Sequence, residues 1–283
     1  MRNPPNSFLG HLSVQPPETL YHYTSMEVLI SILKTGRLWS SNLRYLNDSS
    51  EVKHVIGIIG ERLDALTSNP NTFNHQSVAS LKSKLAAAMK ANVFITCFSE
   101  SKDDLSQWRG YAPEGCGVCI GFSSSALQKA AQTEAIPASE KRHNTVSFLT
   151  NVIYVDKDSG PTFDLIIEDM LNERPETSPK PSTMLALSAP FYKNSSFQDE
   201  REWRIVTRSV LSNLSQIQYR VGKSTLVPYL ELNLKSCEED FISEVIVGPS
   251  PNIDLSVEAL QQMMDGGMKN VVVTPSDIPY RHW

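Results

Sequence analysis

The chain has no apolar run that approaches the roughly 18 consecutive apolar residues a membrane-spanning helix needs. Hydrophobic residues make up 40% of the 283 residues and charged residues 20%, which are ordinary values for a globular protein. The first residues, MRNPPNSFLGHLSVQPP, lack the compact apolar segment of a secretory signal, and their prolines predict a loose arm over residues 1–18. We therefore expect a soluble, cytoplasmic protein without a membrane partner.

Cysteine is also scarce. The four cysteines, Cys97, Cys116, Cys119 and Cys237, are too few for a disulfide scaffold. Cys116 and Cys119 lie in GCGVCIGF, and the sequence offers no second pair of metal ligands, so we expect reduced strand residues and no metal. The net charge of −5 argues against a general polyanion-binding surface, which leaves nucleic acid only as a docked substrate.

Hydrophobic periodicity predicts a mixed fold. TLYHYTSMEVLISILKTGRLWS reads as a strand that ends at His22 and Tyr23, followed by a helix that Thr24 and Glu27 cap and that ends at Gly36. Further helices are predicted at 52–63, 78–89, 163–173 and 256–267. Strands are predicted at 91–100, 117–122, 151–156, 200–208, 217–221, 226–234, 243–249 and 270–275. With no repeat and one proline-rich exposed loop at 173–182, the pattern predicts a single α+β domain over residues 19–283.

The segment FQDEREWRIV contains the most informative charges. Strand alternation would place Glu200, Glu202 and Arg204 on one face, with two carboxylates close together. Like charges this close are destabilising unless cations relieve them. Either Arg204 and solvent satisfy them on an exposed face, or they form a catalytic pair in which one stabilises a developing cation and the other positions a nucleophile.

Two aromatic residues, Trp108 and Tyr111, lie in a polar segment flanked by glycines, which is predicted to be a loop or a short helix. They could cap the edge of the sheet, or they could offer a stacking surface to a planar ring. His22 could likewise be a hydrogen-bonded structural residue or a ligand contact.

The segment RYLNDSSE offers three further polar side chains, which are Asn47, Asp48 and Glu51. Turn formation and helix capping explain them, and contact with a polar ligand is the alternative.

Taken in order, HYT at a strand end, LND..E, CFSE, W..YA...G and E.E.R resemble a bacterial family, domain of unknown function 2971, over roughly residues 20–208. More distantly, the plan resembles the ADP-ribosyltransferases. Their poly(ADP-ribose) polymerase and RNA phosphotransferase branches begin with a His-x-Thr/Ser strand and a helix that ends in Gly. This resemblance implies an α+β fold of split mixed and antiparallel sheets with flanking helices.

The resemblance also implies roles for individual residues. His22 matches the contact to the ribose of NAD, Tyr23 and Thr24 match the pair that holds the nicotinamide amide, and Ser106 matches a serine near the stacking aromatic. That aromatic is either Trp108 or Tyr111. Among the carboxylates, Glu202 matches the catalytic glutamate and Glu200 the first member of an E-x-E pair.

The expected function is therefore that of an NAD-dependent ADP-ribosyltransferase, a bacterial toxin or phage-defence effector that modifies a protein or nucleic acid. NAD would be its co-substrate, no metal is expected, and an antitoxin or regulatory partner fits that role. An NAD glycohydrolase and a non-catalytic nucleotide-sensing or interaction module are the alternatives. Because Glu202→Gln is isosteric, we expect it to remove NAD cleavage and leave the fold nearly intact.

Overall fold

The computed structural model describes residues 14–46, 49–67, 78–83, 92–112, 117–134, 146–156, 167, 189–208, 216–222, 224–236, 240–267 and 270–279. Its α-helices include α2 (Met26–Thr35), α3 (Ser49–Thr67), α5 (Leu105–Tyr111), α6 (Ser124–Glu134) and α9 (Ile253–Asp265). Short 3-10 helices are η1 (Leu43–Tyr45), η2 (Ala189–Phe191), η3 (Ser195–Glu200) and η5 (Leu234–Ser236).

The strands follow one another along the whole described chain. They are β1 (Thr19–Ser25), β2 (Arg37–Asn42), β3 (Val93–Ser99), β4 (Gly117–Ser123), β5 (Val146–Asn151), β6 (Ile153–Val155), β7 (Tyr192–Asn194), β8 (Glu202–Arg208), β9 (Gln218–Val221), β10 (Leu226–Asn233), β11 (Ile242–Val247) and β12 (Val272–Pro275). Ten of them form one sheet, while β6 and β7 form a separate parallel pair.

The large sheet forks at its central strand, β3. One edge of β3 pairs with β8 along its whole length, and β8 pairs with β5. The other edge meets β1 at Tyr21↔Ser99 and meets β2 at Ser41↔Ile95 and Asn42↔Phe94. Since one edge of β3 serves two strands, the sheet divides into an arm of β1, β4, β11 and β12 and an arm of β2, β10 and β9. All these pairs are antiparallel except β11 with β12.

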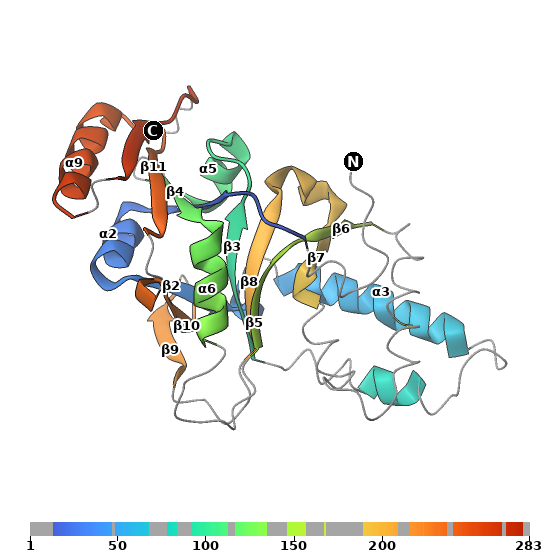
Figure 1. Ribbon diagram of the computed structural model, residues 1–283. Coiled ribbons are helices and arrows are strands. Elements are labelled where there is room, and N and C mark those ends of the chain that lie inside the picture. Colours follow the sequence, from blue (N-terminus) through green and yellow to red (C-terminus); the bar gives the residue numbers. More distant parts are fainter. Residues whose placement is uncertain are drawn as a thin grey trace.

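Helix α2 connects the two arms across the fork (Figure 1). Its buried residues Leu29 and Ile32 face the core. The helix ends as predicted, because Gly36 adopts φ 64° and donates its N–H to the carbonyl of Ile32. Its N-cap, however, is Ser25, whose hydroxyl accepts from the N–H of Val28, while Thr24 still pairs with Val118 in the strand. The predicted cap at Thr24 was therefore wrong by one residue.

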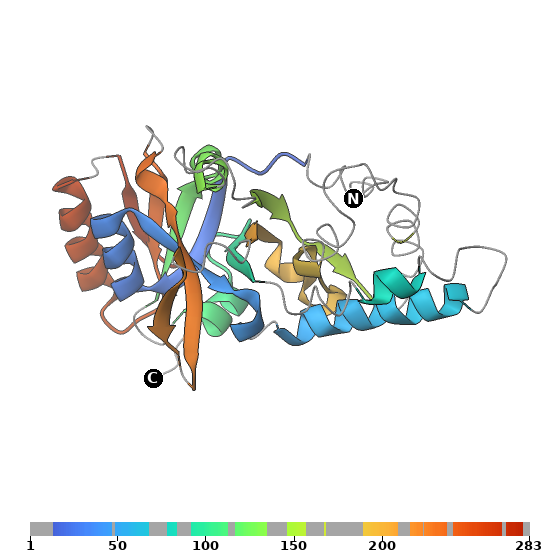
Figure 2. The same ribbon diagram turned by 90° about the horizontal axis from the view of Figure 1, so that it is seen from below.

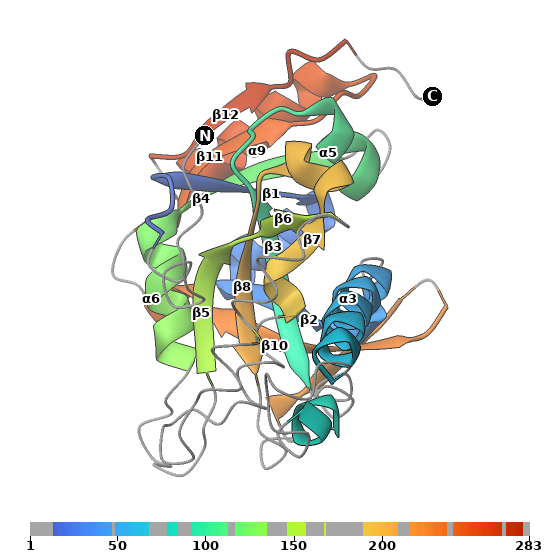
Figure 3. The same cartoon turned by 90° about the vertical axis from the view of Figure 1, so that its right-hand side faces the viewer.

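Hydrophobic cores lie on both faces of the central strands. Ile205 belongs to a core with residues of α2, α6 and α9, and its neighbour Val206 belongs to a second core with Val55 and Ile59 of α3. Strand alternation explains this division, because adjacent side chains point to opposite faces. Figure 3 shows α6 and α3 on opposite sides of β5, β8 and β3, and Figure 2 shows α3 extending away from the forked arms.

The α+β class predicted from the sequence is confirmed as a mixed α+β fold with a mixed sheet. Strands β2, β5 and β7 and helix α6 were not predicted. Of the predicted helix at 163–173 only residue 167 is described, and the loop at 173–182 lies outside the described residues, as do residues 1–13 of the predicted arm. In the part of the chain that the structure describes, no helix has the length and apolar character to cross a membrane.

Candidate functional site

The fork leaves one edge of β3 without a partner among the described strands between its contacts with β1 and β2. Within the described residues, no strand pairs with residues 96–98 on this edge. His22 fills part of the opening, because its Nδ1 lies 2.9 Å from the carbonyl oxygen of Cys97. A carbonyl can only accept a hydrogen bond, so Nδ1 carries the proton. Burial lowers the pKa of His22, against the opposing effect of this hydrogen bond, so the neutral ring leaves Nε2 as an acceptor.

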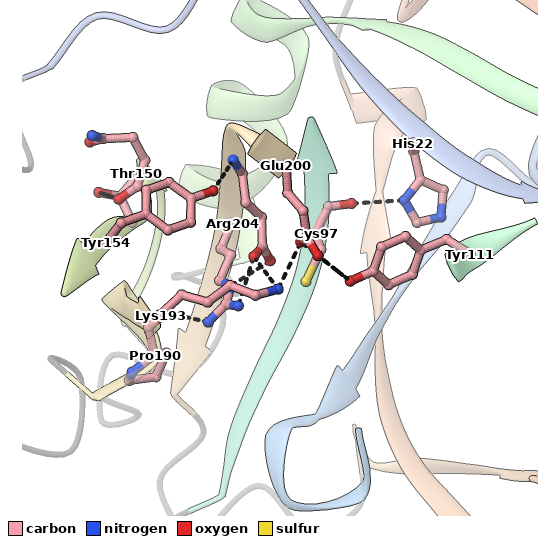
Figure 4. A network of polar contacts seen from close by, with 11 residues as sticks. His22, Cys97, Tyr111, Thr150, Tyr154, Pro190, Lys193, Glu200 and Arg204 are labelled. Carbon is pink, nitrogen blue, oxygen red and sulfur yellow. Dashed lines mark hydrogen bonds and ion pairs between the residues drawn. The ribbon is translucent and has the colours of Figure 1, made fainter. Parts of the chain in front are cut away.

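A cluster of four charged residues lies across β3 from His22 (Figure 4). Arg204 binds Glu202 through both carboxylate oxygens, with Nε to Oε1 at 2.6 Å and Nη2 to Oε2 at 2.8 Å. Lys193 Nζ lies 3.1 Å from Glu202 Oε2 and 2.7 Å from Glu200 Oε2, so one ammonium group bridges both carboxylates. The formal charges of the four groups cancel.

Burial makes these contacts energetically important. Glu202 is only 5% exposed, and Lys193 and Arg204 are also buried. Burial raises the pKa of Glu202, but Arg204 and then Lys193 outweigh this effect and lower it to about 2. Glu202 is therefore ionised at neutral pH. The alternative that Arg204 and solvent satisfy the carboxylates on an exposed face is correct in the pairing with Arg204 and wrong in the exposure, because Glu202 and its cations are buried.

The prediction that Glu200, Glu202 and Arg204 share one face of a strand is correct for Glu202 and Arg204 and wrong for Glu200. Strand β8 begins at Glu202, whereas Glu200 is the last residue of η3. Between them Arg201 adopts φ 44°, in the left-handed region, which breaks the alternation. The two carboxylates still meet, because Lys193 on β7 reaches both of them.

Tyr111 and Trp108 have different surroundings. Tyr111 is 43% exposed, and its hydroxyl donates to Glu200, 3.2 Å from Oε1. Trp108 is 4% exposed, packs edge-on against Tyr23 with ring centroids 4.8 Å apart, and donates its indole N–H to Asp103. Of the two aromatics, Tyr111 is thus the one placed beside the carboxylates, and Trp108 packs as the sheet-capping alternative describes.

Tyr23 anchors the loop that leads into α5. Its hydroxyl donates to the carbonyl of Ser101 at 2.8 Å and accepts from the N–H groups of Asp103 and Asp104, at 2.9 and 3.0 Å. Burial raises the pKa of this phenol, which keeps it a hydrogen-bond donor at neutral pH. Tyr23 thereby fixes the position of α5 and of Tyr111 at its end.

The remaining predicted residues are spread around the fork. Ser106 donates its hydroxyl to Asp104 Oδ1 at 2.5 Å and takes part in capping α5. Thr24 lines a second cavity that also includes His22. Asn47 and Asp48 lie outside the described residues, and so does the side chain of Glu51.

A pocket of about 60 Å³ brings the central residues together. It draws its lining from β1, β3, α5, η3 and β8, and the residues are Tyr21, His22, Tyr23, Cys97, Phe98, Ser99, Gln107, Tyr111, Glu200 and Glu202. His22, Tyr111, Glu200 and Glu202 therefore share one concave surface, whereas Trp108, Thr24 and Ser106 are not part of its lining.

Sequence reasoning missed three residues that shape this site. Lys193 bridges the carboxylates, the Tyr154 hydroxyl accepts from the N–H of Glu202 at 2.8 Å, and buried Gln107 lines the pocket. A lysine inside the apolar segment APFYKN was the one available signal for the first of them. Among the described residues, no group of His, Cys, Asp and Glu is arranged to hold a metal ion.

A protein-family comparison identifies one match. The model described as "Protein of unknown function (DUF2971)" matches residues 107–205, which is about a third of the chain. This match supports the resemblance to that family. It covers a shorter segment than the motifs, which predicted a resemblance over roughly residues 20–208. It includes Tyr111, Lys193, Glu200, Glu202 and Arg204, and it does not include His22. Searches among curated proteins and solved structures found no match.

Proposed function

We propose that the chain is an NAD-dependent ADP-ribosyltransferase that transfers ADP-ribose to a macromolecule. The observation that carries this proposal is the convergence of His22, Tyr111 and the two glutamates on one pocket from distant parts of the chain. The forked sheet supports the accompanying proposal of an ADP-ribosyltransferase-like fold, because the resemblance implies split sheets. The acceptor class, protein or nucleic acid, and a role as a cytoplasmic toxin or defence effector with an antitoxin belong to the same proposal.

The residues present fit the chemistry of NAD. NAD supplies the bond between ribose and nicotinamide, which breaks with release of neutral nicotinamide while positive charge develops on the ribose. Ionised Glu202 provides negative charge for that step, and the exposed ring of Tyr111 provides a surface for a planar ring. The Nε2 of neutral His22 can accept a hydrogen bond from a ribose hydroxyl.

Glu200 has a different environment from Glu202. Its carboxylate is more exposed, at 15% against 5%, and it bonds both Lys193 and Tyr111. It is therefore the carboxylate better placed to meet an acceptor group. In the proposed transfer, the acceptor's nucleophile forms a bond to the same ribose carbon and gives its proton to a base, a role that fits Glu200.

One observation favours a second candidate, a non-catalytic module that binds a nucleotide in this pocket. Lys193 and Arg204 neutralise the two carboxylates, which reduces the field that they exert on a cationic ribose. In this case, the cluster would hold η3 and β8 together, and the pocket would recognise a ligand without breaking a bond.

Incubation with NAD labelled in its adenine half tests the proposal. We expect the wild-type chain to release nicotinamide and to label a macromolecule when cell lysate is added. Release without labelling would identify a glycohydrolase. Glu202→Gln should reduce the rate by about 10²-fold or more. The matched control is Glu258→Gln, an exposed glutamate on α9.

The variants must be compared at a temperature at which circular dichroism shows each to be folded. If the wild type binds NAD but releases no nicotinamide, with or without lysate, the catalytic proposal is rejected and the second candidate is favoured. Wild-type turnover by folded Glu202→Gln would remove Glu202 from the mechanism.

A further inference from the structure

A second and larger cavity lies in the fork between the two arms of the sheet. Its volume is about 240 Å³, compared with about 60 Å³ for the pocket that contains Glu202. Residues of β1, α2, β2 and β9 line it, and His22 is the one residue common to both linings. The fork creates this space, because β1 and β2 leave the same edge of β3 at different points.

Two arginines line this cavity, Arg37 from β2 and Arg220 from β9. Within the described residues neither of them forms an ion pair with a carboxylate. Glu231, which lies directly opposite Trp39 on the neighbouring strand, is likewise not paired with them. The cavity therefore carries two positive charges that no described acidic side chain neutralises.

Arg220 is held in place without being fully satisfied. Its Nη2 donates to Ser41 Oγ at 3.2 Å, and its Nε is buried without a hydrogen-bond partner among the described residues. A buried donor on a charged group costs free energy unless an acceptor pairs with it. An anionic ligand that carries several oxygens, such as a phosphate group, would supply that acceptor and neutralise both arginines.

An aromatic wall adjoins the arginines. Trp39 is 37% exposed and lines the cavity, and its ring lies 4.6 Å from that of buried Tyr229, which supports it from the neighbouring strand. The alternation of β2 places Arg37, Trp39 and Ser41 on one face. A partly exposed indole held by a second ring is a suitable surface for stacking a planar group.

We propose that this cavity binds the phosphate ester of a planar aromatic group, a ligand of the nucleoside phosphate class. Arg37 and Arg220 hold the phosphate, and Trp39 stacks on the ring. An apolar ligand would leave the two arginines unneutralised, and a free inorganic anion would make no use of Trp39. This inference rests on the cavity alone and does not require the proposed transferase activity.

Calorimetric titration of the full chain with ADP, adenosine and inorganic phosphate tests the inference. We expect ADP to bind more tightly than either fragment. Arg37→Gln and Arg220→Gln should each weaken ADP binding by about tenfold or more and leave adenosine binding nearly unchanged. Trp39→Leu should weaken both ligands by about tenfold. Arg44→Gln, which changes an exposed arginine outside the cavity, is the matched control and should bind ADP as the wild type does.

The affinities also separate this inference from the proposed function. Nicotinamide release from NAD is measured on the same wild-type preparation, because ADP binding in this cavity without release would support this inference and reject the proposed transferase. Arg220→Lys, which retains the charge, should lose less affinity than Arg220→Gln and guards against a variant that merely misfolds. Three results would each overturn the inference. They are equal affinity for ADP and adenosine, no binding of ADP, and unchanged ADP binding in both arginine variants when these keep the wild-type melting temperature.

Discussion

Glu202→Gln should destabilise the protein, contrary to what its isosteric shape suggests. The carboxylate of Glu202 accepts from Arg204 at 2.6 and 2.8 Å and from Lys193 at 3.1 Å, all in buried surroundings. Glutamine keeps the shape but carries no charge, and its amide NH₂ would face one of these donors. The substitution thus leaves buried positive charge insufficiently paired.

The pKa of Glu202 sets the size of this effect. Burial raises the pKa, but Arg204 and Lys193 lower it from 4.5 to about 2, a difference worth about 3 kcal/mol at about 1.36 kcal/mol per pH unit. Since the folded pKa lies below the unfolded one, this stabilisation is fully present above pH 4.5 and is lost as the pH falls towards 2. At about 2–4 °C per kcal/mol, the melting temperature at pH 7 should fall by about 6–12 °C.

Urea unfolding followed by circular dichroism at pH 7 and pH 3 provides the measurement. The free energy of unfolding of Glu202→Gln should lie about 3 kcal/mol below that of the wild type at pH 7, and roughly half of that difference should disappear by pH 3. Glu258→Gln should match the wild type at both values. The reasoning fails if the wild type and Glu202→Gln are equally stable at pH 7, or if their difference is the same at pH 3.

Two further substitutions test the hydrogen bonds of Tyr23 and the role of the Glu200 carboxylate. Tyr23→Phe removes a hydroxyl that donates one hydrogen bond to the loop before α5 and accepts two from it. The free energy of unfolding should fall by about 1–3 kcal/mol, with a changed tryptophan fluorescence spectrum. An unchanged stability would show that the Tyr23 hydroxyl does not hold this loop. Glu200→Gln should impair transfer of ADP-ribose more than hydrolysis of NAD, and equal losses in the two assays would place Glu200 in the cleavage step or in a structural role.

Local patterns explain what the sequence could predict. The strand that carries His22 and the helix ending at Gly36 follow from apolar periodicity and from a residue able to adopt the left-handed conformation, and neither depends on distant contacts. The same holds for β3 and β4, whose apolar runs are nearly continuous, and for the apolar second half of β11. Strand β2, with the sequence RLWSSN, has little such signal and is defined by its pairing with β10.

The charged cluster could be predicted only in part. Alternation placed Glu202 and Arg204 together, but it assumed an extended residue at position 201, where Arg201 has a positive φ. Lys193 belongs to a strand of three residues whose partner is β6, so no short-range pattern connects it to Glu200 and Glu202. Likewise, Trp108 and Tyr111 have similar sequence contexts. Their different roles follow from a distant contact, the packing of Trp108 against Tyr23 on β1.

The neutrality of the cluster allows the proposed ligand binding and the proposed bond cleavage to be tested separately. If the site is catalytic, Lys193 partly neutralises the charge of Glu202 in the free protein. The double variant Lys193→Met with Glu200→Gln removes one charge of each sign. It should leave NAD affinity nearly unchanged while the cleavage rate changes. If the site only recognises a nucleotide, the wild type and this double variant bind NAD and neither releases nicotinamide. Measuring affinity and nicotinamide release on the same preparations therefore distinguishes the two, because a folding defect would lower both values together.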